Sequence, residues 1–208
     1  MPGETTRRRG AALEADLLDA AWAELKAVGY TKLTMEGVAA RARTGKQVLY
    51  RRWSNRAELV IAAMRHRTGS IADRVPDTGS LREDVLEVLR AGARRQREIG
   101  PDTLHGLLAE ARDVDPSFFG IMRGVLRMLV ERAAERGEIP TAELPRRVLT
   151  LPADLLRHEI LLSREQVTDE TLTEIVDDVF LPLVVRQRPA PPGETVRASE
   201  RATAYRDC

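Results

Sequence analysis

Apolar side chains recur every three or four residues along almost the whole chain, which restricts it to helical folds. No stretch stands out with the alternating pattern of a half-buried strand. The clearest case is the segment 10–28, where one face carries a hydrophobic stripe that ends at a glycine: Leu13, Leu17, Ala21, Leu25 and Val28, followed by Gly29. We therefore predict an all-α protein.

Two short helices and a third, longer one are predicted after this first helix. Thr34 is placed to cap a helix whose inward positions are Val38, Ala39 and Ala42. A break at 43–45 precedes a second helix, and Asn55 with Glu58 has the spacing of a capping box for the third. Two helices of about two turns with such a short connection form a helix-turn-helix unit.

The pattern predicts further helices after residues 68–79. This segment holds a proline and two glycines and is the expected domain boundary. Ser80 and Glu83 predict a capping box, and Pro152 predicts a kink or break. The helices are expected over 80–99, 101–111, 116–136, 142–163 and 169–186. Residues 187–208 are proline- and charge-rich, and we expect a disordered tail.

The net charge of +1 hides a strong asymmetry. Residues 1–67 hold thirteen Lys/Arg and seven Asp/Glu, and the segment 41–56 holds six basic residues and no acidic one. A basic block of this kind favours binding to a polyanion, because neutralised phosphates release counterions. An ordinary solvated basic face is the alternative.

An ordered set of residues across the two short helices carries a family resemblance: Thr34, Val38-Ala39, Ala42, Leu49-Tyr50, Arg52-Trp53, Asn55-Arg56 and Glu58-Leu59. This pattern resembles the TetR family of transcriptional regulators, over roughly residues 13–65. The chain departs from the pattern at Arg43, where a glycine is usual, and at Gly45, where a serine or threonine is usual. Because arginine disfavours a left-handed backbone, we expect Gly45 to absorb the strain of the turn.

The second helix is the expected recognition helix, which in this unit enters the major groove of DNA. Gln47 can pair with adenine, and Lys46 or Arg51 can donate to guanine; the resemblance implies a phosphate contact for Tyr50. Phosphate contacts are also expected from residues at helix starts and in the turn: Thr34, Arg43, Thr44, Gly45, Arg52 and Arg56. Residues 1–9 form a basic arm that either follows the minor groove or only solubilises the chain.

The resemblance implies that the later helices bind an effector and dimerise. Candidates for the effector pocket are Leu104, His105, Leu108, Phe118, Met122, Val125, Leu129 and His158. Candidates for the dimer interface are Leu155, His158, Leu162, Leu172, Val176, Val179, Phe180 and Leu183. Plain core packing is the alternative for each of these sets. The expected domains are thus an arm (1–9), a DNA-binding domain (10–67), an effector-binding and dimerisation domain (68–186) and a tail (187–208).

The predicted function is that of a ligand-responsive regulator, most often a repressor in this family, with an activator as the alternative. It binds a palindromic operator in double-stranded DNA as a homodimer and is released by a small molecule. The alternatives are a helical interaction protein without specific DNA binding and a helical enzyme. We expect no catalysis, metal or cofactor, because the three histidines lack metal-ligand spacing and the only cysteine is Cys208. No apolar stretch is long enough to span a membrane, and we expect a cytoplasmic protein.

Overall fold

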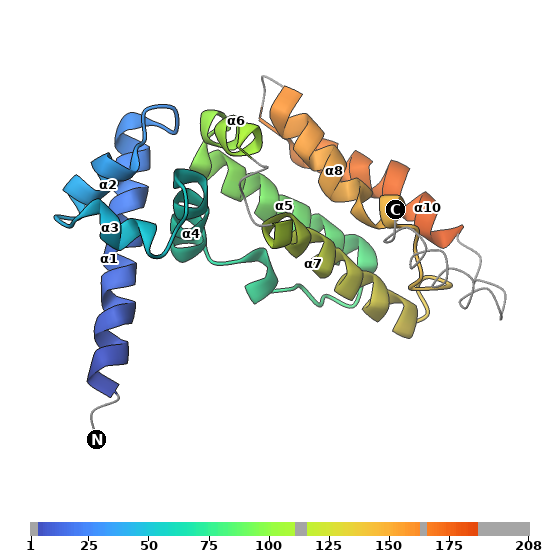
Figure 1. Cartoon of the computed structure of the whole chain (residues 1–208). Coiled ribbons are helices and arrows are strands. Elements are labelled where there is room, and N and C mark those ends of the chain that lie inside the picture. Colours follow the sequence, from blue (N-terminus) through green and yellow to red (C-terminus); the bar gives the residue numbers. More distant parts are fainter. Residues whose placement is uncertain (1–3, 111–115, 163–165, 187–208) are drawn as a thin grey trace, which may run out of the picture.

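The computed structural model describes residues 4–110, 116–162 and 166–186; the side chains of residues 4–9 and 116–119 lie outside this description. The described residues form helices and turns and contain no strand, as the periodicity predicts. The helices at the N-terminal end form one group, and the later helices form a second group beside it (Figure 1). No helix in the described ranges is long and apolar enough to cross a membrane.

The N-terminal group consists of α1 (Glu4–Val28), α2 (Met35–Arg41), α3 (Lys46–Tyr50) and α4 (Arg56–Thr68). Helix α1 begins at Glu4, so most of the expected flexible arm is helical; its polar residues are compatible with one more turn of helix. The helix ends as predicted at Gly29, whose positive φ of 74° suits a residue without Cβ and whose N–H bonds Leu25 O at 2.9 Å.

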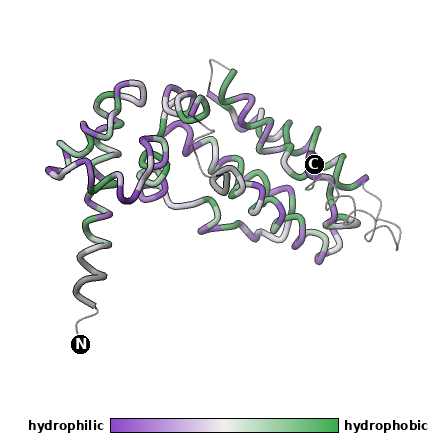
Figure 2. The backbone as a smooth tube through the Cα atoms, in the orientation of Figure 1, coloured by the Kyte–Doolittle hydropathy of each residue, from purple (hydrophilic) through white to green (hydrophobic). Residues whose placement is uncertain are grey.

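The second group consists of η1 (Ile71–Asp73), α5 (Leu81–Ile99), α6 (Pro101–Ala109), α7 (Pro116–Glu135), α8 (Arg146–Leu162), α9 (Asp169–Glu174), the π-helical segment η3 (Ile175–Phe180) and α10 (Leu181–Val185). Figure 2 shows hydrophobic and hydrophilic residues alternating along the turns of α5, α7 and α8, as one buried face per helix requires. Their buried faces meet in a core around Leu89, Leu126 and Phe180.

The structure differs from the prediction in details of this group. The Ser80 side chain makes no cap hydrogen bond, and the Leu81 N–H instead donates to Glu138 Oε2 at 2.7 Å. Helix α8 starts at Arg146 rather than near 142, because Pro145 disfavours helical backbone at the residue before it. It continues through the buried Pro152 without a break, and the kink predicted there stays a prediction.

The two groups have separate hydrophobic cores that touch at one place. The N-terminal core is built from α1 to α4, with Ile99 of α5 and Leu107 of α6 packed into it. The Lys26 ammonium of α1 also donates to the Glu98 carbonyl of α5 at 3.0 Å. The end of α5 and helix α6 therefore connect the second group to the first.

Candidate DNA-binding surface

Helices α2 and α3 form the predicted helix-turn-helix unit. Thr34 caps α2, and its Oγ1 accepts the Gly37 N–H at 3.0 Å. The turn closes through the Thr44 N–H, which donates to Ala39 O at 2.9 Å. Arg43 itself takes the left-handed conformation with φ 53°, whereas Gly45 is extended with φ −80°. The expectation that Gly45 absorbs the strain is thus wrong, because the hydrogen bonds of the turn require the left-handed residue at position 43.

Small residues and a buried leucine hold the two helices on α1 and α4. Val38 and Leu49 are fully buried, and Trp53 belongs to the same core. A Cβ at Gly37 would lie 2.9 Å from Glu24 Oε1, the carboxylate that pairs with Arg41 at 2.7 Å. Gly37 therefore lets α2 approach α1 closely enough for this ion pair, which fixes the orientation of the unit.

The recognition face, which we define as Lys46, Gln47, Tyr50 and Arg51, lies exposed on α3. Tyr50 is 49% exposed, although a large aromatic side chain is usually buried. Within the described residues, the side chains of Gln47, Tyr50 and Arg51 make no hydrogen bond or ion pair with the chain. Lys46 pairs with the exposed Glu36 at 3.3 Å, and a contact of this kind is readily exchanged for a phosphate or a base.

The other predicted contacts, apart from Arg56, surround this face. Arg43, Gly45 and Arg52 are exposed beside α3, and Thr44 is half-buried in the turn. The Arg52 guanidinium donates to Val48 O at 3.2 Å, which leaves most of its donors available. Thr34 is exposed at the start of α2, where its hydroxyl proton remains free to bond a phosphate while its oxygen caps the helix.

Arg56 lies at the start of α4, as the sequence predicts, but it is already paired within the chain. Its guanidinium pairs with both carboxylate oxygens of Glu110 at the end of α6, and also donates to Leu33 O at 3.1 Å. It lies over the Tyr30 ring, with 4.9 Å between the guanidinium carbon and the ring centroid. The Arg56 guanidinium is thus engaged inside the protein, and a phosphate contact, which stays a prediction, would compete with Glu110.

Tyr30 completes this junction cluster, by which we mean Tyr30, Arg56 and Glu110. The Tyr30 hydroxyl donates to Glu110 Oε2 at 2.9 Å. Burial, then the bond to Glu110, raises the pKa of Tyr30, so the hydroxyl stays a donor. The hydrogen bonds from Arg56 lower the pKa of the Glu110 carboxyl below its ordinary value, so it stays ionised at neutral pH. The cluster joins the turn after α1 to α4 and to the end of α6 by charge-assisted hydrogen bonds.

A glycine makes the junction cluster possible. A Cβ at Gly106 of α6 would lie 2.1 Å from Cδ1 of Tyr30, so only glycine lets α6 lie against the buried ring. Neither Tyr30 nor Glu110 was predicted from the sequence, since Arg56 and Tyr30 are 54 and 80 positions from Glu110. The only sequence signal was the glycine itself, which is unfavourable inside a helix unless packing needs it.

The residues predicted for the effector pocket differ in their burial. Val125 and Leu129 are buried in the second core, which makes them packing residues rather than an accessible surface. Leu104, Leu108 and Met122 are half-buried, whereas His105 and His158 are exposed, and His105 lies 3.4 Å from Leu161 O. The Phe118 side chain lies outside the described residues, as do the tail at 187–208 and the first three residues of the arm.

The residues predicted for the dimer interface divide into two sets. Leu172, Val176 and Phe180 are buried within the chain itself. They therefore belong to the intramolecular core and not, as expected, to a dimer interface. Leu162 is 70% exposed, and His158, Val179 and Leu183 are also exposed, with Leu155 half-buried. The π-helical turn of η3 lies among these positions, and Val185 beside them is an exposed residue that the sequence did not predict.

Comparisons with known proteins cover both parts of the chain. The family of bacterial regulatory proteins of the tetR type matches residues 17–63, and the tetracyclin repressor-like C-terminal domain matches residues 75–179. The DNA-binding transcriptional repressor TetR of Mycobacteroides abscessus is 34% identical over 185 residues, which are 85% of this chain and 96% of that protein. An HTH-type transcriptional regulator of Mycobacterium tuberculosis is 33% identical over 182 residues, 83% of this chain and 88% of that protein.

Solved structures share the fold at lower identity. The TetR family transcription regulator SCO0332 superimposes with a TM-score of 0.62 at 23% identity, over 81% of this chain and 96% of that one. RolR without ligand gives a TM-score of 0.60 at 19% identity, over 85% and 98% of the two chains. A helix-turn-helix unit with an exposed recognition face, the matching N- and C-terminal families and relatives of nearly full length agree with one another. The chain therefore belongs to the TetR family of DNA-binding transcriptional regulators.

Proposed function

We propose that the chain is a repressor that binds a palindromic operator as a homodimer and is released by a small-molecule effector in the cytoplasm. Residues 10–67 form its DNA-binding domain, and residues 68–186 form its effector-binding and dimerisation domain. The observation that carries the proposal is the recognition face, where Gln47, Tyr50 and Arg51 are exposed on a rigidly packed helix without partners in the described chain. Unused donors and acceptors at a fixed position are what base and phosphate recognition needs.

The electrostatics of the helix-turn-helix unit support the same proposal. Of the six basic residues in 41–56, three pair with carboxylates of the chain, namely Arg41, Lys46 and Arg56. The other three, Arg43, Arg51 and Arg52, make no ion pair within the described residues. Arg43 lies in the turn before α3, and Arg51 and Arg52 follow α3 directly. The positive charge that remains uncompensated is therefore concentrated on the recognition face and its borders, where a DNA backbone would lie.

A homodimer follows from the size of the recognition helix. Helix α3 has five residues and can contact only a few base pairs, so specific binding needs a second copy on the next half-site, about one helical turn away. The exposed apolar residues Leu162, Val179 and Leu183 offer a surface for such a contact. The relatives named as transcriptional repressor and regulators support a role in repression.

The test is selection of bound sequences from a random duplex DNA pool. The wild type is compared with the double variant Gln47→Ala/Tyr50→Ala, and with the control Arg127→Ala/Met128→Ala, which removes two exposed side chains from α7. We expect an inverted repeat to be enriched by the wild type and the control and lost by the α3 variant. Enrichment of nothing by the wild type at moderate salt, or an equal result for the α3 variant, would contradict the proposal.

A further inference from the structure

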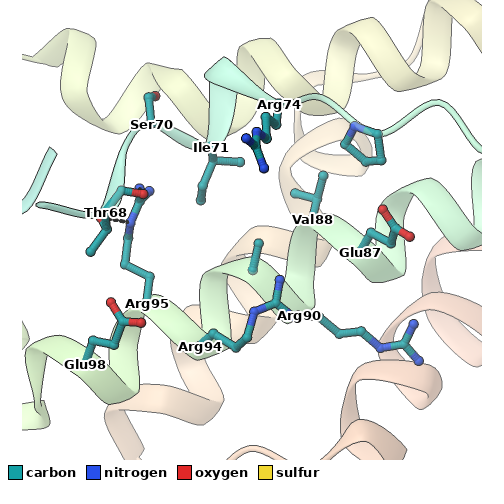
Figure 3. A pocket seen from close by; sticks show the side chains of 12 residues that line it. Thr68, Ser70, Ile71, Arg74, Glu87, Val88, Arg90, Arg94, Arg95 and Glu98 are labelled. Carbon is teal, nitrogen blue, oxygen red and sulfur yellow. Dashed lines mark hydrogen bonds between the residues drawn. The ribbon is translucent and has the colours of Figure 1, made fainter. Parts of the chain in front are cut away.

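A cavity of about 530 Å³ lies between α5 and the segment that connects it to α4. Figure 3 shows Ile71 and Arg74 on the η1 side of the cavity and Arg94 and Arg95 on the α5 side, whereas the Arg90 side chain extends away from it. None of the residues that the sequence predicts for an effector pocket lines it. Its volume is in the range of small-molecule sites in proteins, about 300–1,000 Å³.

The arginines of this cavity are unequally paired. Arg90 holds the Asp169 carboxylate with two hydrogen bonds of 2.6 Å, so its charge is neutralised. Arg74 and Arg94 are exposed at the cavity, and no ion pair among the described residues includes either of them. Glu87 and Glu98 also line the cavity, so its lining carries four basic and two acidic side chains.

Arg95 makes its hydrogen bonds to neutral groups only. Its Nε donates to Thr68 Oγ1 at 2.8 Å, and its Nη2 donates to the carbonyls of Thr68 and Gly69. These partners are neutral, and no described carboxylate lies within ion-pair distance of it. Burial lowers the pKa of Arg95 and the nearby Glu98 and Asp73 oppose this, yet an arginine stays protonated, so a half-buried positive charge without a directly paired anion lines the cavity.

The remaining lining is apolar and suits the body of a ligand. Ile71, Pro76, Val88 and Ala91 contribute hydrocarbon surface beside the arginines. The two glutamates disfavour a ligand with two negative charges, whereas one charge is accommodated by the excess of cations. We propose that this cavity binds a small organic monoanion, a carboxylate on an apolar body, held by Arg74, Arg94 and Arg95.

The position of the cavity gives such a ligand access to the DNA-binding domain. Thr68 and Gly69 end helix α4, which packs on α1 and follows the recognition helix in the chain. A carboxylate that binds Arg95 competes with the carbonyls of Thr68 and Gly69 for the same donors, and so changes how α4 is held on α5. This role as the effector site rests on the proposed function, whereas binding of the anion does not.

Binding is tested on the full chain by isothermal titration with 4-phenylbutyrate and with its uncharged analogue 4-phenylbutyramide. We expect the wild type to bind the carboxylate at least about tenfold more tightly than the amide, since charge-assisted hydrogen bonds are worth one order of magnitude or more. The double variant Arg74→Gln/Arg94→Gln should bind the carboxylate at least about tenfold more weakly. Arg127→Gln, the same change at an exposed arginine of α7 outside the cavity, should bind like the wild type.

Three results would overturn the site: no binding of the carboxylate at millimolar concentration, equal binding of the amide, or full binding by the double variant when circular dichroism shows that it is folded. The effector role has its own test, the affinity for a selected operator with and without saturating carboxylate. We expect a loss of affinity in the wild type and none in the double variant. An unchanged affinity in the wild type removes the effector role, and failure to select any operator counts against the proposed function alone.

Discussion

The recognition face and the junction cluster contain the same kinds of side chain in opposite situations. Tyr50 is 49% exposed and Tyr30 is 2% exposed. Arg51 makes no ion pair in the described chain, whereas Arg56 pairs with Glu110 and lies over the Tyr30 ring. A tyrosine and an arginine in the DNA-binding domain thus acquire their roles from the side chains around them, not from their residue types.

The two regions also depend on each other. The junction cluster fixes α4 and α1 against α6, and through Leu49 and Trp53 the same core holds α3. A recognition helix of five residues has few contacts of its own, so its position is set by this packing. Variants of the junction should therefore alter stability and the position of α3, whereas variants of the recognition face should alter DNA binding alone.

The largest expected effect is that of Gly106→Ala at the junction. The new methyl group would overlap the Tyr30 ring at 2.1 Å, and the ring is buried, so either the ring or α6 must move. We expect a loss of about 2–3 kcal/mol in the free energy of unfolding, the range of overpacked cores, measured by urea denaturation. Gly124→Ala in α7 is the control, since nothing lies within 4 Å of its Cβ and helix propensity should make it neutral or stabilising. Equal stability of the two variants would show that the junction is loosely packed.

The sequence predicted those parts of the molecule that depend on neighbouring residues. The cap at Thr34, the glycine after α1 and the spacing of the helix-turn-helix unit are local signals, and all three are present in the structure. The all-α fold follows from periodicity in the same way. The recognition face was predicted because the geometry of this unit determines which side of the second helix is exposed; its contacts with DNA stay a prediction.

The parts that could not be predicted depend on distant residues. Arg56 has the sequence signature of a phosphate contact at a helix start, and only the approach of Glu110 from α6 gives it another partner. Similarly, the apolar spacing of Leu172, Val176 and Phe180 is compatible with either an outer or an inner face until the packing of the second core is known. Periodicity identifies the face of a helix that is buried, but it does not identify what buries it.

The next effect is on sequence recognition by α3. Gln47→Ala should weaken binding to the selected operator by about 1–3 kcal/mol and relax the preference at one base pair, if Gln47 contacts a base. Arg52→Ala, at the border of the face, should weaken binding about equally on all sequences and lower the salt dependence by about one charge. Affinities on the operator and on its single-base variants, measured at several salt concentrations, distinguish the two. Uniform weakening by Gln47→Ala would place its contact on the backbone instead.

A smaller effect is expected for the pair of Arg56 and Glu110. Both side chains are about one third exposed (33% and 29%), so solvent screens them, and a double-mutant cycle of Arg56→Gln and Glu110→Gln should give a coupling of about 1 kcal/mol. Because the folded-state pKa of Glu110 is lowered, this stabilisation is present above the ordinary carboxyl pKa and is lost as the pH falls through the folded-state value. Urea unfolding at pH 7 and at acidic pH tests the sign. Coupling that increases towards acidic pH would contradict the pairing.

The smallest effect on stability is expected at Arg43, where the same substitution should stabilise the fold and weaken DNA binding. Arg43 has φ 53° in the turn before α3, a conformation that costs a residue with Cβ about 1–2 kcal/mol. Glycine relieves this cost but loses more conformational freedom on folding, so Arg43→Gly should stabilise the chain by only about 0.5–1 kcal/mol in urea denaturation. Binding to the operator should nevertheless weaken, since an exposed and unpaired cation beside the recognition face is removed. Arg43→Ala should lose the same charge without the gain in stability, so equal stability of the two variants would mean that the turn stores no strain at this position.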